Sequence, residues 1–279
     1  MATQSASDPP VSATEALGRA AVRSLASVGR GMAELGYATS LLLQSLFFLV
    51  FGRFRHQPVR LPSVIDQMME IGIRALPIAT ILSLMIGVTL AMQGIDLLRT
   101  FGAESQVVLA VSLSISREFA PLIMGILVAG RSGSALAARL GTMVISQEID
   151  ALRVMGINPV RYLVVPSMVS MVLLLPLLTF WADLMGLLGG ALYTRLELGM
   201  SFQAYADATI EALTVDHLMH GIGKSAIFAV LINLVAVVNG LAVSGGAEQV
   251  GRATTRTVVL SIAGIIVTDM LFIFVLTRG

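Results

Sequence analysis

The sequence predicts an all-α integral membrane protein with an N-terminal interfacial helix, five transmembrane helices and a short cytoplasmic helix between two of them. Hydrophobic residues make up 56% of the 279-residue chain and charged residues 13%, whereas soluble domains carry about 25% charged residues. The mean hydropathy is +0.87. Five apolar segments each reach about twenty residues, the length that crosses a hydrocarbon core of about 30 Å. Together these observations indicate a polytopic membrane protein.

The first 60 residues contain two segments that are not predicted to cross the membrane. Residues 1–15 are small, polar and proline-bearing, which predicts a disordered tail and not a signal peptide. Residues 16–60 are predicted to form an interfacial amphipathic helix and elbow, because within 17–35 apolar residues recur at helical spacing opposite a cluster of arginines. The apolar stretch 41–51 is too short to cross the membrane. It either continues the surface helix as an elbow or packs against the bundle.

The distribution of basic residues predicts the topology. The five predicted spans lie at 71–93, 107–130, 162–192, 222–243 and 257–276. Six Lys and Arg residues precede the first span, the successive loops hold one, four, one and two, and one follows the last span. Because basic residues concentrate on the cytoplasmic side, the N-terminus and the loops 131–161 and 244–256 are predicted to be cytoplasmic. Five spans then place the C-terminus on the periplasmic side.

Charged residues inside the predicted spans are candidate functional groups, because charge at this depth is costly. Arg117 and Glu118 project about 100° apart on a helix, so they are poorly placed to pair with each other. They either face a wet cavity or a polar ligand, or pair with other spans. Asp183 and Asp269 are either proton carriers, partners in helix–helix hydrogen bonds, or residues near an interface. Pro121 lacks the N–H that would bond the carbonyl of Arg117, which predicts a break in the helix there.

The predicted loop 131–161 contains a short amphipathic helix at 146–157. It carries acidic, basic and apolar residues and is followed by residues that stop a helix. The residues concerned are Glu148, Asp150, Leu152, Arg153 and Met155, then Gly156 and Pro159. A short amphipathic helix between two spans is predicted to be a docking element, with Leu152 and Met155 on one face.

Several function classes are disfavoured by the composition. The chain has no cysteine, so it contains no disulfide and no thiolate ligand. His217 and His220 lack a further ligand set, which argues against a metal site. The run HGIGKS at 220–225 has Leu218 where a phosphate loop needs glycine. A net charge of +1 gives no reason to expect a nucleic-acid partner. With no catalytic motif, the chain is predicted not to be an enzyme and to need no cofactor of its own.

Three motifs resemble one family in the same order. They are REFAPLIMGILVAGRSGSALAARLG from Arg117, EIDALRVMGINP from Glu148 and GGAEQVGRATTRTVV from Gly245. The chain from about residue 71 to its C-terminus resembles the permease subunit of MlaE-type ABC lipid transporters, the partners of MCE proteins. Residues 61–279 are therefore interpreted as an MlaE-type permease domain.

The resemblance implies a lipid cavity at the axis of a homodimer, opening outward, and a coupling helix that binds an ATPase. The residues it places along the cavity are Gln93, Leu97, Leu98, Phe101, Arg117 and Glu118, and the apolar Phe119 adjoins them. The coupling residues map to Glu148, Asp150, Leu152 and Met155. Phe101 departs from the family pattern, because relatives can carry tyrosine there.

The resemblance also implies the cellular setting. The chain is expected in the bacterial inner membrane, moving phospholipid between that membrane and a periplasmic MCE-domain protein in the service of outer-membrane lipid asymmetry. ATP would be hydrolysed by a separate cytoplasmic ABC subunit, with a small cytoplasmic STAS-type subunit as a further expected partner. The alternative from the residues themselves is an ion-coupled transporter or channel that uses Arg117, Glu118, Asp183 and Asp269. The lack of an internal repeat favours the permease.

Overall fold

The computed structural model describes residues 29, 32–33, 36–49 and 61–278. The predicted tail 1–15 and most of the predicted surface helix 17–35 lie outside the described residues. Within the described part helices connected by short loops make up the chain, without a strand. The prediction of an all-α membrane protein is confirmed.

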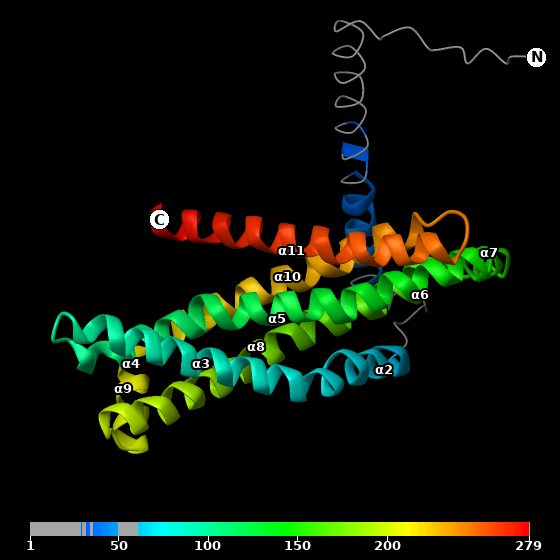
Figure 1. Ribbon diagram of the computed structural model, residues 1–279. Coiled ribbons are helices and arrows are strands. Elements are labelled where there is room, and N and C mark those ends of the chain that lie inside the picture. The colour runs from blue at the N-terminus through cyan, green and yellow to red at the C-terminus, as the bar shows by residue number, and fades with distance from the viewer. Residues whose placement is uncertain (1–28, 30–31, 34–35, 50–60, 279) are drawn as a thin grey trace, which may run out of the picture.

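Five long helical units run side by side and account for the five predicted spans (Figure 1). They are Pro62–Arg99, Glu104–Ile145, Val160–Leu198, Val215–Leu241 and Ala247–Val275. The second unit continues to Ile145, so much of the predicted loop 131–161 is helix. The fourth ends two residues earlier than expected. Each unit is longer than the corresponding predicted span, although the fourth and fifth end before it does.

The units are built from the following elements. The first consists of α2 (Leu61–Ile71), η1 (Ile73–Ala75) and α3 (Leu76–Arg99). The second consists of η2 (Glu104–Gln106), α4 (Val107–Ser114), η3 (Ile115–Phe119), α5 (Ala120–Val128), η4 (Ala129–Gly133) and α6 (Ser134–Ile145), followed by the short α7 (Glu148–Val154). Then come η5 (Val160–Val164), α8 (Val165–Leu198), α9 (Phe202–Ala212), α10 (Val215–Leu241) and α11 (Ala247–Arg278). The segments η3, η4 and η5 are π-helical turns.

The predicted break at Pro121 is a widened turn instead. Pro121 lies at the start of α5, directly after the π-turn η3. A proline cannot donate to the preceding turn, and a π-turn absorbs that loss without interrupting the helix. The carbonyl of Arg117 instead accepts a hydrogen bond from Lys224 on α10 at 3.2 Å. The prediction of a broken helix is wrong. The backbone carbonyl that such a break would free, that of Arg117, is nevertheless available and bonds to Lys224.

Glycines bring α3 and α8 into close contact. A Cβ on Gly87 would overlap the carbonyl of Gly186, and a Cβ on Gly189 would overlap that of Leu84. Small residues of this kind allow membrane helices to pack backbone against backbone. One turn away, Trp181 donates a hydrogen bond to Thr80 at 2.9 Å. The first and third units therefore form one tightly packed pair.

The helix Gly36–Leu49 runs across the direction of the five spans (blue in Figure 1). Leu41 and Ser45 are buried, with 2% and 1% of their surfaces exposed, while Leu43 and Leu46 are more than half exposed. The helix therefore packs against the bundle along one face, as one of the two interpretations of 41–51 expected. Its orientation in the figure suits the other interpretation, an elbow at the membrane surface.

The helix α9 was not predicted. It lies beside α4 at the end of the bundle opposite α7 (Figure 1). The hydroxyl of Ser201 caps it by accepting from the amide of Ala204 at 3.1 Å. Tyr205 is buried at 4% exposure, and this burial raises the pKa of its phenol to about 12. The phenol is thus neutral at physiological pH, and it anchors α9 on the bundle.

We predict that Gly87→Ala destabilises the fold. The added methyl group would meet the backbone of Gly186, which cannot move like a flexible side chain, and overpacking costs about 1 to 3 kcal/mol. The thermal unfolding midpoint of the detergent-solubilised protein should fall. Gly223→Ala is the matched control, because nothing lies within 4 Å of a Cβ there. Equal midpoints for the two variants would contradict the close α3–α8 contact.

Candidate functional site

A buried lysine joins three helical units inside the membrane. The ammonium of Lys224 on α10 lies 2.7 Å from Glu118 Oε2 on η3 and 3.0 Å from Asp269 Oδ1 on α11. It also donates to the carbonyl of Arg117 at 3.2 Å. The ring of Phe272 lies 5.8 Å from the ammonium. We refer to Arg117, Glu118, Lys224 and Asp269 as the charge cluster.

The local backbone brings these groups together. The π-turn η3 frees the Arg117 carbonyl and places Glu118 toward α10. Gly221, one turn before Lys224, has no side chain to separate α10 from η3, and a Cβ there would overlap the carbonyl of Ser116. A π-turn and a glycine therefore combine to let the two backbones approach.

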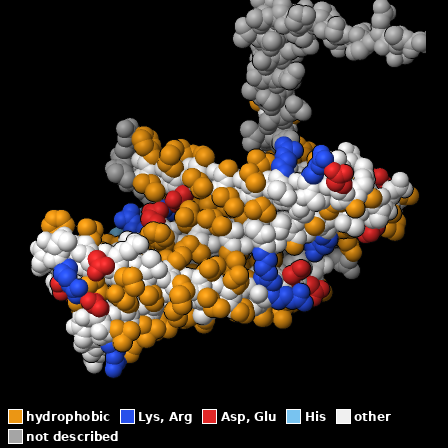
Figure 2. Space-filling model, viewed as in Figure 1, with side chains coloured by type: hydrophobic (Ala, Val, Ile, Leu, Met, Phe, Trp, Pro, Cys, Tyr) orange, Lys and Arg blue, Asp and Glu red, His pale blue; other side chains and the backbone are white. Residues whose placement is uncertain are grey.

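The charge cluster is electrically balanced. It contains two basic and two acidic side chains, and Lys224 at its centre has 2% of its side chain exposed. Removing a charge from water is costly unless it is paired and hydrogen-bonded, and two carboxylates meet that need. Asp269 is 15% exposed and Glu118 is 37% exposed, so the cluster is open on one side of the single chain. Figure 2 shows acidic and basic atoms in a depression of the hydrophobic band, between α11 and the α4–α5 region.

Arg117 differs from its neighbours in the charge cluster. Among the described residues, no hydrogen bond or ion pair involves its guanidinium, although its own carbonyl is bonded to Lys224. The two interpretations of the Arg117–Glu118 pair therefore separate. Glu118 makes the structural pairing with another span, whereas Arg117 is partly exposed and keeps its planar set of donors for another group.

The two membrane aspartates also differ. Asp269 pairs with Lys224 across helices, so the interpretation of Asp269 as an interhelical partner is confirmed. Asp183 on α8 is 1% exposed, and neither of its carboxylate oxygens has a hydrogen-bond partner in the described part of the chain. Asp183 thus lies in the core without a visible counterpart.

Lys224 was missed from the sequence. It lies within the predicted span 222–243, in the run HGIGKS, which the sequence analysis weighs only as a phosphate loop. That run lies inside α10, so its rejection as a phosphate loop is confirmed. The sequence does contain a feature that marks this residue, because Lys224 is the only lysine in the sequence and lies in an apolar segment. Within the described ranges, no three His, Cys, Asp or Glu residues form a group that could hold a metal.

The other predicted cavity residues form no closed pocket: Gln93, Leu97 and Phe101 are exposed, whereas Leu98 packs partly against the core. Gln93, Leu97, Leu98 and Phe101 lie at the end of α3 and just beyond it, with Leu97 63% and Phe101 75% exposed. Gly94 packs there against Val107 at the start of α4. Arg117 lies ten residues further along, about 15 Å at helical rise. Phe119, beside Arg117, is 37% exposed. Lipid contact by these residues stays a prediction.

The structure corrects the predicted docking face of α7. Leu152 is 8% exposed and belongs to the hydrophobic core, together with Ile149 at 4%. The prediction that Leu152 shares an outward face with Met155 is therefore wrong. The outward apolar side chains are Val154, 89% exposed, and Met155, 63% exposed. Leu152 anchors α7 by packing into the bundle, so it is not available on the outward face where Met155 lies.

The ends of α7 are well defined. Glu148 accepts a hydrogen bond from the Ser146 hydroxyl at 2.8 Å, and Asp150 pairs with Arg153 at 2.9 Å on the surface. Both acidic groups lie in the first turn, where they complement the helix dipole. At the other end Gly156 has a φ of 75°, and the amide of Ile157 donates to the carbonyl of Leu152 at 2.9 Å. The helix is thus held in place as a compact projection.

Comparison with known proteins identifies relatives over most of the chain. The family model of the permease MlaE matches residues 64–275. A probable ABC transporter permease protein of Rickettsia typhi is 31% identical over 248 residues, 87% of this chain and 96% of that protein. The intermembrane phospholipid transport system permease protein MlaE of Haemophilus influenzae is 31% identical over 216 residues, 76% of this chain and 83% of that protein. The chloroplastic TRIGALACTOSYLDIACYLGLYCEROL 1 of Arabidopsis thaliana is 33% identical over 207 residues, 74% of this chain and 59% of that protein.

We predict that Lys224→Met alone strongly destabilises the bundle. It leaves Glu118 and Asp269 without their shared cation, and breaking a buried ion pair costs about 3 to 5 kcal/mol. Thermal unfolding in detergent should show this loss. The triple variant Glu118→Gln, Lys224→Met, Asp269→Asn removes all three charges and should recover most of the stability. A single variant as stable as the unmodified protein would mean that the charge cluster does not hold these helices together.

Proposed function

The chain belongs to the permease MlaE family, and on this premise we propose that it is the membrane-spanning subunit of an ABC transporter that moves phospholipid. The lipid would pass between the bacterial inner membrane and a periplasmic MCE-domain protein, and this traffic would maintain the lipid asymmetry of the outer membrane. The chain itself would bind the lipid and change conformation. Hydrolysis of ATP would occur in a separate cytoplasmic subunit.

The observation that carries the proposal is the guanidinium of Arg117, which has no partner in the described part of the chain and lies beside exposed apolar side chains. A phospholipid needs a cation for its phosphate and apolar walls for its acyl chains. Arg117 supplies the first, Phe119 beside it is 37% exposed, and the exposed side chains of Leu97 and Phe101 lie near the end of the α3–α4 hairpin, about 15 Å from Arg117 at helical rise. Glu118, held by Lys224, balances this charge and would keep the lipid from binding too tightly.

A second copy of the chain would complete the pathway. In the most apolar stretches of the first and fifth units, 28% and 11% of the residues are buried, compared with 50% or more in the other three. These units therefore offer large apolar faces to their surroundings. A homodimer with two-fold symmetry would cover part of that surface and enclose a lipid between the copies.

The short helix α7 suits the ATPase contact. It projects at one end of the bundle (Figure 1) and presents the exposed Val154 and Met155 next to the surface ion pair of Asp150 and Arg153. A cytoplasmic position of this end is supported by the basic residues of the loop 131–161 under the positive-inside rule. A small STAS-type subunit would bind on the same side of the complex.

One observation favours the alternative of ion-coupled transport. Asp183 is buried without a partner in the described part of the chain, as a proton carrier in a membrane protein can be. The remaining charges argue against a charge path, because Lys224 is locked between Glu118 and Asp269. The permease proposal therefore accounts for more of the structure.

We predict that Arg117→Ala lowers phospholipid occupancy without destabilising the bundle. No described group loses a partner when the guanidinium is removed, and a charge-assisted hydrogen bond is worth about 1.5 to 3 kcal/mol, or roughly tenfold or more in affinity. Bound phospholipid per purified dimer and the unfolding midpoint should be measured together. Arg252→Ala is the control, because it removes an exposed arginine outside this path that pairs with Glu248 on the surface. Unchanged occupancy in a stable Arg117 variant would remove Arg117 from the lipid path.

We predict that Met155→Asp abolishes ATPase association and leaves the dimer intact. The substitution puts a charge on the outward apolar face of α7 without touching the core. Copurification of the ATPase subunit and its stimulated hydrolysis are the measurements. Leu196→Asp is a matched control, because Leu196 is 85% exposed at the other end of the bundle. Leu152→Asp should instead lower thermal stability. Normal ATPase recovery with Met155→Asp would refute the docking role of α7.

A further inference from the structure

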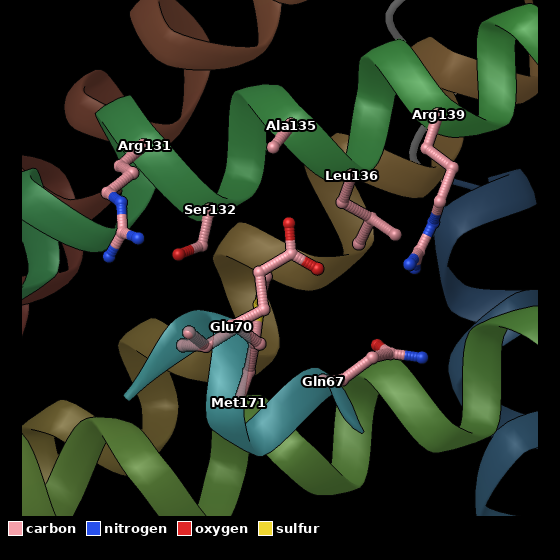
Figure 3. Close-up of a pocket in the computed structure, with 9 residues that line it drawn as sticks. Gln67, Glu70, Arg131, Ser132, Ala135, Leu136, Arg139 and Met171 are labelled. Atoms are coloured by element: carbon pink, nitrogen blue, oxygen red, sulfur yellow. The ribbon is translucent and has the colours of Figure 1, made fainter. Parts of the chain in front are cut away.

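A polar cavity lies on the side of the bundle nearer to α7. It has a volume of about 150 Å³, is partly open, and is lined by residues of α2, of the η4–α6 segment and of α8 (Figure 3). Its polar lining includes Arg131, Arg139, Glu70 and Gln67. Arg131 follows Glu118 by thirteen residues on the same helical unit, about 20 Å at helical rise. The cavity is therefore separate from the charge cluster.

Both arginines of this cavity are available to a ligand. Nη1 of Arg131 is buried and has no hydrogen-bond partner in the described part of the chain. An unmet donor in such a place costs free energy that a bound acceptor would recover. Arg139 lies two turns further along and reaches the same space from the other side (Figure 3). Two guanidinium groups that converge on one cavity are the usual way in which proteins bind a phosphate.

Glu70 occupies the middle of the cavity. In Figure 3 its carboxylate lies between the guanidinium groups of Arg131 and Arg139. No ion pair within 4.0 Å joins Glu70 to either arginine among the described residues. The charges sum to one positive, so the cavity attracts an anion, while Glu70 opposes it. Glu70 therefore acts as a built-in competitor that weakens the binding of an anion.

The remaining walls are apolar and favour an amphipathic ligand. Ile71, Leu136 and Met171 line the cavity beside the charged groups. Ser132, 8% exposed, adds a hydroxyl next to Arg131. We propose that this cavity binds a phosphate group, carried by the head of an anionic phospholipid in the leaflet on the α7 side. The leaflet assignment rests on the topology of the proposed function, whereas the binding of phosphate does not.

The test compares lipid retention by variants of the full-length protein purified in mild detergent. The probe is phosphatidylglycerol, with zwitterionic phosphatidylethanolamine and inorganic phosphate as parallel arms, and retention is read by native mass spectrometry. Arg131→Gln with Arg139→Gln should lower phosphatidylglycerol retention about tenfold or more. Glu70→Gln should raise it, because the competing charge is gone. A merely structural role for Glu70 would not increase lipid binding.

The controls separate this site from general charge effects and from the proposed transport path. Arg252→Gln removes an exposed arginine, paired with Glu248 at 2.7 Å, outside the cavity and should leave retention unchanged. The cavity variants are also made in an Arg117→Ala background, where Arg131→Gln with Arg139→Gln should still lower phosphatidylglycerol retention, so failure of the transport proposal and failure of this one are distinguishable. If the double variant does not fold, Arg139→Gln alone provides the same test, since Arg139 is exposed.

Each result has a defined meaning. Loss of phosphatidylglycerol with the arginine variants supports a lipid head-group site. Displacement of bound phosphatidylglycerol by millimolar inorganic phosphate supports the phosphate site but assigns it to the free ion. Equal retention by the unmodified protein and the arginine variants, or reduced retention with Glu70→Gln, would overturn the proposal.

Discussion

The ion pairing of Lys224 is the interaction on which the arrangement of the helices depends. A hydrocarbon core offers no water to an ammonium group, so a lysine at this depth must find its partners within the protein. Glu118 and Asp269 come from units that are distant in sequence and meet on the same nitrogen. These ion pairs fix how the three helical units are aligned along one another. Apolar packing alone would fix that alignment only weakly, because lipid tails are as apolar as the helix surfaces.

The small and irregular features of the second and fourth units follow from that constraint. The π-turn before Pro121 gives Lys224 a backbone carbonyl as a third ligand, and Gly221 removes the side chain that would keep α10 away. A regular α-helix with a larger residue at position 221 would separate the charges that need each other. The π-turn thus lies where its freed carbonyl bonds to Lys224. Within a membrane, irregular backbone is tolerated where its polar groups are satisfied by the protein.

Three basic side chains in the bundle have different surroundings, and these surroundings distinguish structural from ligand-binding roles. Lys224 is buried and doubly paired, so it stabilises the fold. The guanidinium of Arg117 and one nitrogen of Arg131 have no partner among the described residues. Each lies beside apolar side chains, at different depths along one helical unit. The two sites proposed for the head of a lipid are therefore separated along the bundle.

Span number, helical class and the position of α7 follow from the sequence alone, because hydropathy, segment length and helix-stop residues such as Gly156 act locally along the chain. The membrane depth of Arg117 and Glu118 follows in the same way. The partners of those charges do not, since they depend on which faces of non-adjacent helices meet. Lys224 was overlooked, Leu152 was placed outward when it is in the core, and α9 was missed because its eleven residues are held by tertiary contacts of Tyr205. Pairing and burial are properties of the packed bundle, so only the three-dimensional structure assigns them.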